Sequence, residues 1–307
     1  MNTDKDAPKT LIEAIRYFSD PDVCLNFVAD LRWPDGVTCP HCESKELSFL
    51  TTRRIWKCKT CKKQFSVKVG TIFEDSPIGL DRWLAANWMI ANAKNGISSY
   101  EVARALVVTQ KSAWFMMHRI RLAMETGTFK KLSGEVEVDE TWIGGKVANM
   151  HKHKRPNKSE GETNKTIVMG FKEREGEVRT KVIKDTSRYT LHGEVLRHVE
   201  EGATVFSDTH PGYSKLQLDY IHQMIDHSEA YAVGNNHING VENFWSLVKR
   251  CVKGTYVHVD DEHVFRYLEE ESFRYNNRET NDGGRFIKMV GAVAGRRITY
   301  KQLTGRE

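Results

Sequence analysis

The sequence contains no apolar run that approaches the roughly eighteen residues of a membrane-spanning helix. Its opening stretch, Met1 to Lys9, is polar and rich in charge, so it lacks the apolar segment of a secretory signal peptide. These absences argue against a membrane protein and against a secreted one, so we expect a cytoplasmic protein with no membrane partner. At 307 residues, the chain has room for about two or three domains.

Cysteine is also scarce, and neither an export signal nor a thioredoxin-like βαβ pattern is present to favour disulfides or a redox pair. Four of the six cysteines form two Cys-x-x-Cys pairs separated by fifteen residues: Cys39, Cys42, Cys58 and Cys61. Two such pairs can bring four thiolates around one structural zinc, with short strands at Leu47, Phe49 and Ile55 to Trp56 completing a zinc ribbon. Cys24 and Cys251 are interpreted as ordinary buried thiols.

The net charge is only +5, but positive charge is concentrated in this zinc-ribbon region. From Cys39 to Lys68 there are eight lysines or arginines against two glutamates. A small zinc module with this imbalance is typical of a nucleic-acid-binding surface. The alternative is that the charges only keep a tiny metal domain in solution.

The stretch that follows has the periodicity of helices. Ser98 to Glu101 form a capping box that begins a short helix, and Thr109 caps a longer one over 110–124. Four residues of the longer helix are expected to face inward: Ala113, Met117, Ile120 and Met124. Lys111, His118 and Arg119 would face outward, and the first turn, Gln110 to Ser112, would face a DNA major groove as in helix-turn-helix proteins. The alternative is an ordinary helical packing unit that links two domains.

From residue 135 onward, strands and helices alternate. The predicted elements are strands over 135–143, 166–172 and 179–184, a helix over 190–199, and strands over 203–207 and 229–233. Glu175-Gly176 marks a hairpin turn between the second and third strands. Three antiparallel strands, a crossover helix, a fourth strand and later helices are the order of an RNase H-like core, which is a mixed α/β fold.

Three acidic residues occupy informative places in this region. Asp139 and Asp208 each end a strand-like run, and Glu242 lies in the first turns of a helix. A carboxylate at the end of an apolar strand needs a cation or hydrogen-bond donors to offset its desolvation. Three such groups can bind two Mg²⁺ ions about 4 Å apart, which neutralise a phosphodiester during phosphoryl transfer. Lys249 follows Glu242 by seven residues, shares its helix face and could hold a substrate phosphate.

Other polar residues have weaker claims to function. Glu140 should point to the opposite sheet face from Asp139, where a salt bridge or a loop contact is expected. His237, just before the helix, is expected to be a structural cap rather than a proton carrier. The basic segment 146–165 is either a DNA-contacting loop or a solvated linker.

Together these motifs resemble the insertion-sequence DDE transposases, and more narrowly the group with an N-terminal zinc ribbon and a helix-turn-helix-like region, the bacterial relatives of the Merlin elements. The resemblance rests on the two cysteine pairs and on three further stretches: Val138 to Lys146, Ser207 to Tyr213, and His237 to Ser246 with Lys249. It implies that Asp139, Asp208 and Glu242 are the catalytic acids. Some relatives use asparagine in the third position, so Asn239, one turn before Glu242, is held as an auxiliary ligand; glutamate is the stronger Mg²⁺ ligand.

The implied activity is metal-assisted hydrolysis at the ends of a mobile element, followed by attack of the exposed 3′-hydroxyls on target DNA. The ribbon and helical region would recognise terminal inverted repeats, and pairing two ends implies at least a dimer. Two other functions stay open from the sequence: an RNase H-like nuclease without strand transfer, and a zinc-ribbon DNA-binding regulator with a non-catalytic α/β domain.

The expected organisation has five parts. They are an N-terminal helical segment (1–35), the zinc ribbon (36–70), a helix-turn-helix-like DNA-binding region (78–128), the RNase H-like catalytic domain (133–280) and a basic C-terminal tail (281–307).

Overall fold

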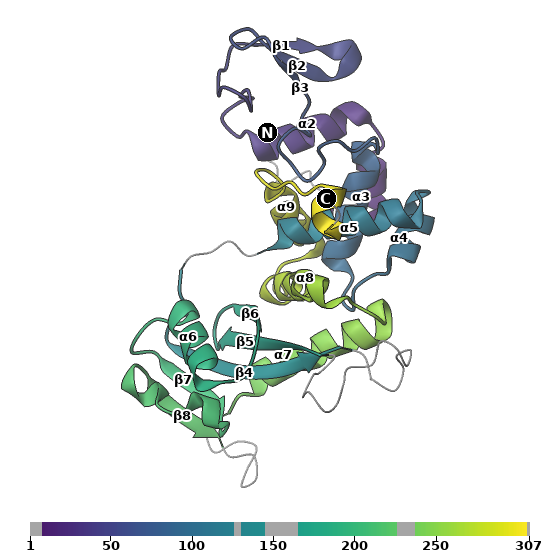
Figure 1. The fold of residues 1–307 in the computed structure, drawn as a ribbon. Coiled ribbons are helices and arrows are strands. Elements are labelled where there is room, and N and C mark those ends of the chain that lie inside the picture. The colour runs from purple at the N-terminus through teal and green to yellow at the C-terminus, as the bar shows by residue number, and fades with distance from the viewer. Residues whose placement is uncertain (1–7, 126–129, 145–164, 226–236, 306–307) are drawn as a thin grey trace. The chain divides into compact units, whose positions relative to one another are not determined.

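The computed structural model of the chain describes residues 8–125, 130–144, 165–225 and 237–305 (Figure 1). The chain divides into two compact units, one formed by residues 1–125 with 277–307 and the other by residues 126–276. None of the helices in the described ranges has the length and apolar character needed to cross a membrane. The predicted strand over 229–233 and nearly all of the basic segment 146–165 lie outside the described residues.

The first unit combines helices with a small antiparallel sheet in the order β1-β2-β3. The helices are α1 (Leu11–Tyr17), α2 (Pro21–Arg32), α3 (Leu80–Asn92), α4 (Ser99–Leu106), α5 (Gln110–Met124), α9 (Asp282–Gly291) and α10 (Tyr300–Thr304). The strands are β1 (Leu47–Leu50), β2 (Ile55–Cys58) and β3 (Gln64–Phe65). The short strands expected between the cysteine pairs are therefore confirmed.

The helix pair α4 and α5 begins where the sequence predicts. The Ser98 hydroxyl accepts the Glu101 N–H, and the Glu101 carboxylate accepts the Ser98 N–H, which completes the capping box. Val107 ends α4 in the left-handed region at φ 53°, and Thr109 then caps α5. The two helices begin and end as expected, whereas their helix-turn-helix-like role in DNA binding stays a prediction.

The outward face predicted for α5 is wrong at two positions. His118 and Arg119 are buried, and the Arg119 guanidinium donates to the Glu74 carbonyl and lies 5.4 Å from the centre of the Trp83 ring. The reason lies in the tertiary structure, where α5 packs against α3, α4 and α9, which is distant in the sequence. More of the surface of α5 is therefore buried than its hydrophobic periodicity predicts. Lys111 in the first turn remains exposed.

The C-terminal segment is not a tail, because α9 packs into the first unit. Phe286 of α9 is fully buried, stacks on Phe27 with ring centres 5.8 Å apart, and lies 5.1 Å from the Trp88 ring. The Arg285 guanidinium also donates to the side chain of Asn92. The burial of these aromatic rings holds the C-terminal helix α9 against helices from the N-terminal part of the chain.

The second unit is a five-stranded mixed sheet in the order β6-β5-β4-β7-β8 (Figure 1). The strands are β4 (Glu135–Ile143), β5 (Thr166–Glu173), β6 (Val178–Ile183), β7 (Thr204–Asp208) and β8 (Ile221–Ile225). The pairs of β4 with β5 and β5 with β6 are antiparallel, whereas β4 with β7 and β7 with β8 are parallel. With the crossover helix α6 (Arg188–His198) between β6 and β7, this is the RNase H-like topology predicted from the sequence.

Strand β8 was not predicted, because it carries little apolar alternation. Among the described residues it pairs only with β7, at the end of the strand order, and Ile221 and Met224 are exposed. An edge strand with solvated side chains gives no clear period in the sequence.

Helices cover both faces of the sheet. On one face, Leu191 and Val195 of α6 pack with Val136 and Val138 of β4. On the other, α7 (Asn239–Cys251) packs over β4 and β5, and α8 (Val264–Asn276) packs against β6. Because side chains alternate along a strand, the residues between Val136 and Val138, and just after Val138, face α7.

Gly170 of β5 lets α7 approach the sheet closely. It pairs with Asp139 in the β4–β5 register. A Cβ atom at this position would lie 2.5 Å from the Trp245 ring and 3.1 Å from the Val241 side chain. Both neighbours are buried residues of α7, so neither can swing aside.

We expect Gly170→Ala to lower the free energy of unfolding by about 1–3 kcal/mol, because one methyl group overpacks the contact with α7. Thermal or urea unfolding of the full chain measures it. Gly193→Ala in α6 is the matched control, since a Cβ there meets nothing within 4 Å. Equal effects of the two substitutions would show that α7 does not pack this closely on β5.

Candidate functional site

The four paired cysteines form a compact cluster in the first unit. Their sulfur atoms all lie within 4.8 Å of one another. Cys39 Sγ is 3.7 Å from Cys61 Sγ, and Cys42 Sγ is 3.6 Å from Cys58 Sγ. A tetrahedron with Zn–S bonds of about 2.3 Å has edges of about 3.8 Å, so these sulfurs fit one zinc ion. The expected structural zinc site is therefore supported by its geometry.

The two cysteine pairs also share a turn geometry. Glu43 and Lys62, each directly after the second cysteine of its pair, adopt left-handed conformations with φ of 60° and 63°. The backbone N–H groups of Cys61 and Thr60 lower the pKa of Cys58 to about 6. Amide groups that stabilise a thiolate prepare it to bind a metal.

Asp139 on β4 and Asp208 at the end of β7 lie on neighbouring parallel strands. The register pairs Glu137 with Phe206, so the same offset two residues later brings Asp139 opposite Asp208. Adjacent strands are separated by about 4.8 Å. Phe206 packs on the face covered by α7, and Asp208, two residues on, faces the same way. The sheet thus brings two of the predicted acids to one place.

Glu242 reaches this place because it lies in the first turn of α7. The helix packs on β4 and β5, with Val241 and Trp245 against Gly170, the residue that pairs with Asp139. Asn239 is the first residue of α7 and is exposed, and Lys249 is exposed in the last turn of the same helix. The third acid and its two predicted auxiliaries are therefore carried by one element.

The three acids share one electrostatic environment. Burial, together with the charges of Glu140, Asp208 and Glu242, raises the pKa of Asp139 to about 7. Burial and the neighbouring carboxylates both disfavour the ionised form of Asp139. A divalent cation would offset both effects. Carboxylate oxygens are the ligands that Mg²⁺ prefers. Within the described ranges, only the cysteines are grouped as tightly as 4.8 Å; the acids are spaced more loosely.

Sequence reasoning gave no role to Glu137, which joins the sheet to the start of α7. Its side chain is buried and faces the same side as Asp139. One carboxylate oxygen accepts the Val241 N–H at 2.9 Å, at the end of the helix where unpaired N–H groups concentrate. The other oxygen lies 3.2 Å from Arg174 Nε. The sequence contained one indication of this role: Glu137 lies two residues before Asp139 and therefore on the same face of the strand.

Arg174 extends this connection into the segment before α7. Its guanidinium donates to the His237 carbonyl at 2.8 Å and lies 3.8 Å from the centre of the Phe206 ring. His237 does not cap α7 with its side chain, contrary to expectation; its Nδ1 faces Glu137 at 3.4 Å. The segment entering α7 is thus held by one buried ion pair.

Glu140 behaves as the strand alternation predicts. It lies on the opposite face from Asp139, where the Tyr213 hydroxyl donates to its carboxylate at 2.6 Å. His210 Nδ1 is 3.8 Å from the same carboxylate. This cluster packs beneath Asp208, whose side chain accepts the His210 N–H at 3.0 Å. Glu140 supports the loop after β7.

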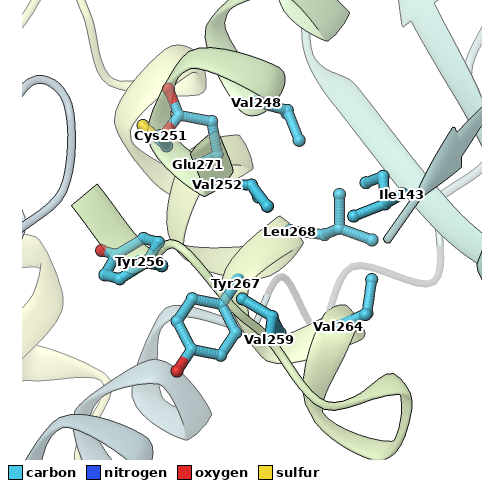
Figure 2. Close-up of a pocket in the computed structure, with 10 residues that line it drawn as sticks. All are labelled: Ile143, Val248, Cys251, Val252, Tyr256, Val259, Val264, Tyr267, Leu268 and Glu271. Carbon is cyan, nitrogen blue, oxygen red and sulfur yellow. The ribbon is translucent and has the colours of Figure 1, made fainter. Parts of the chain in front are cut away.

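The pocket in Figure 2 is separate from the acids. It lies between α7, α8 and Ile143, has a volume of about 10 Å³, and is lined almost entirely by aliphatic and aromatic side chains. The Cys251 thiol at its edge donates to Glu271, and burial raises the pKa of Cys251 to about 12. Cys251 is therefore a buried, unreactive thiol, as expected, and the pocket is a small packing gap.

We expect the purified chain to contain one zinc per molecule and Cys58→Ser to lose nearly all of it, because serine does not replace a thiolate ligand. Metal analysis by atomic absorption measures the content. Cys24→Ser is the control, since Cys24 is buried outside the cluster and donates to the Phe18 carbonyl. Retention of zinc by Cys58→Ser would contradict the four-cysteine site.

Glu137→Ala should lower the free energy of unfolding by about 3–5 kcal/mol, because the largely buried Arg174 loses its buried partner and the Val241 N–H loses its acceptor. Glu135→Ala removes the exposed partner of the same arginine, at 3.4 Å, and should cost under about 1 kcal/mol. Chemical denaturation of both variants gives the comparison. Similar losses would mean that Glu137 has no special place in holding α7.

Family models match most of the second unit and part of the first. Residues 131–276 match the family described as the ISXO2-like transposase domain, and residues 19–64 match the transposase zinc-ribbon domain. A solved structure described as a pre-cleavage Mos1 transpososome covers 65% of this chain and 78% of its own at 12% identity, with a TM-score of 0.23. A score that low carries no structural conclusion.

Two relatives extend the family match. A protein of Halobacterium salinarum described as an uncharacterized protein in transposable element ISH50 is 24% identical over 252 residues, which is 77% of this chain and 84% of the relative. An uncharacterized transposase-like protein of Haemophilus influenzae is 33% identical over 114 residues, which is 37% of this chain and 92% of the relative. With its zinc ribbon and its RNase H-like core, the chain belongs to the ISXO2-like family of insertion-element DDE transposases.

Proposed function

We propose that this protein cleaves the ends of a mobile DNA element and joins the resulting 3′-hydroxyls to target DNA. The observation that carries the proposal is the register that sets Asp139 opposite Asp208 on neighbouring parallel strands of an RNase H-like sheet, with the charges of Asp208 and Glu242 acting on Asp139. The family to which the chain belongs supports DNA as its partner. Both steps are displacements at phosphorus that need no covalent protein intermediate.

The proposed roles follow from the placement of each group. Asp139, Asp208 and Glu242 would hold two Mg²⁺ ions, and Asn239 would assist as a weaker ligand. When bound, Mg²⁺ neutralises phosphate charge and activates the attacking oxygen. Lys249, exposed on the helix that carries Glu242, would hold a phosphate of the substrate strand as a point charge.

The first unit would bind the element's ends. Seven of its eight cations between Cys39 and Lys68 are exposed; Lys68 is the exception, half-buried and donating to the Ser76 and Ile78 carbonyls. The first turn of α5, with the exposed Lys111, would lie against DNA. Because two ends must be paired before joining, the active assembly would contain at least two copies of the chain.

The test is strand transfer in vitro with Mg²⁺, labelled duplexes carrying the element's ends, and supercoiled plasmid. Asp208→Asn should reduce joining by roughly a thousandfold, since several kcal/mol of charge stabilisation is lost. Its thermal stability should be unchanged or raised, because the substitution relieves repulsion with Asp139. Asp219→Asn, at an acid that pairs with His192 instead, is the control and should keep full joining.

Each other outcome points to a different function. Cleavage without joining by the wild type would indicate a nuclease that shares the metal site. Binding of the ends without cleavage or joining would indicate a DNA-binding regulator. Equal joining by wild type and Asp208→Asn would sink the proposed catalytic role of this acid.

A further inference from the structure

A broad groove of about 1300 Å³ lies in the second unit between the edge strand β6 and helix α6. Its walls come from the last residues of β6, the segment that leads into α6, the first turns of α6, and the 3₁₀ turn Pro211–Tyr213 after β7. The volume far exceeds that of the packing gap in Figure 2. Asp139, Asp208 and Glu242 do not line this groove.

The groove is positively charged. Lys181, Lys184 and Arg188 line it, are exposed, and form no ion pair with any residue that the structure describes. The acid in the lining, Glu194, is already engaged by Arg197 at 2.6 Å. Asp185, beside the groove, stays ionised, because hydrogen bonds from the Ser187 and Thr190 side chains and the Ser187 N–H, with the charge of Lys184, lower the pKa of its carboxyl. The lining carries Lys181, Lys184, Arg188 and Arg197 against Glu194, so cations remain in excess even when Asp185 is included.

An aromatic side chain accompanies these cations. Tyr189 lines the groove and is 91% exposed. Burial of a tyrosine ring is favourable, so a ring that stays in water is available to bind a ligand. An exposed ring among unpaired lysines and arginines is the combination that binds nucleic-acid strands: cations contact phosphates, and the ring stacks on a base or sugar.

One wall of the groove follows Asp208 directly in the chain. His210, Pro211 and Gly212 line the groove, and the His210 N–H donates to the Asp208 carboxylate. A Cβ atom at Gly212 would lie 2.7 Å from the Thr186 carbonyl, so this turn packs directly against the segment that leads into α6. A hydrogen bond thus joins the wall of the groove to one of the three acids.

We propose that this groove binds the DNA strand that flanks the phosphate held at the acids, with Lys184 and Arg188 on its backbone and Tyr189 stacked against it. The inference rests on the proposed transposase function and adds the surface that guides the substrate. The ligand chemistry is a DNA sugar–phosphate backbone, which either the element's end or the target could supply.

The test compares two double variants of the full chain that each lose two positive charges. Lys184→Ala with Arg188→Ala changes the groove, and Arg250→Ala with Lys253→Ala changes exposed cations at the far end of α7. Fluorescence anisotropy with a labelled 40-base-pair end duplex, in Ca²⁺, gives affinity against salt. The groove variant should bind about tenfold more weakly and lower the salt slope by roughly 1–2, since each lost phosphate contact changes the slope by about 0.9. The control should change it by less than about 0.5.

Two activity arms identify the source of the DNA. A defect in cleavage of intact ends, with normal joining of pre-cleaved ends, assigns the groove to the element's end; the reverse assigns it to the target. Tyr189→Ala should weaken binding without changing the salt slope, because stacking carries no charge. A groove variant that binds, cleaves and joins like the control would overturn the inference, whereas a wild type that neither cleaves nor joins would overturn the proposed function instead.

Discussion

The buried pair of Glu137 and Arg174 is the interaction on which the arrangement of the second unit depends. Glu137 receives the Val241 N–H of α7 on one oxygen and the Arg174 side chain near the other, while Arg174 also holds the His237 carbonyl. A buried carboxylate needs this many donors to offset its desolvation. Satisfying Glu137 therefore fixes where α7 begins, and with it the position of Glu242.

The sheet supplies the second constraint. Parallel pairing of β4 and β7 brings Asp139 and Asp208 to neighbouring strands, and Gly170 allows α7 to pack closely over them. The same geometry brings carboxylates close together in a buried place, and burial and their charges together raise the pKa of Asp139. Repulsion between these carboxylates lowers the stability of the fold, but the same repulsion would favour the binding of a divalent cation.

A transposase must also bring DNA to its acids. The ribbon offers a cationic surface in the first unit, and the groove along α6 offers another in the second. The turn at Gly212 lies between the end of β7 and the groove, so one short segment contacts Asp208 and forms a wall of the groove. In the proposed function, this one connection would serve both the metal-binding acid and the bound DNA strand.

The sequence by itself determined the zinc site, the helix starts at Ser98 and Thr109, and most of the strands along the chain, because each depends on residues close together in the chain. It also pointed to Asp139, Asp208 and Glu242, whose catalytic role stays a prediction. Only the tertiary structure decided that His118 and Arg119 are buried, that Phe286 returns to the first unit, and that Glu137 holds α7. These features arise from packing between segments far apart in sequence, which local periodicity cannot register.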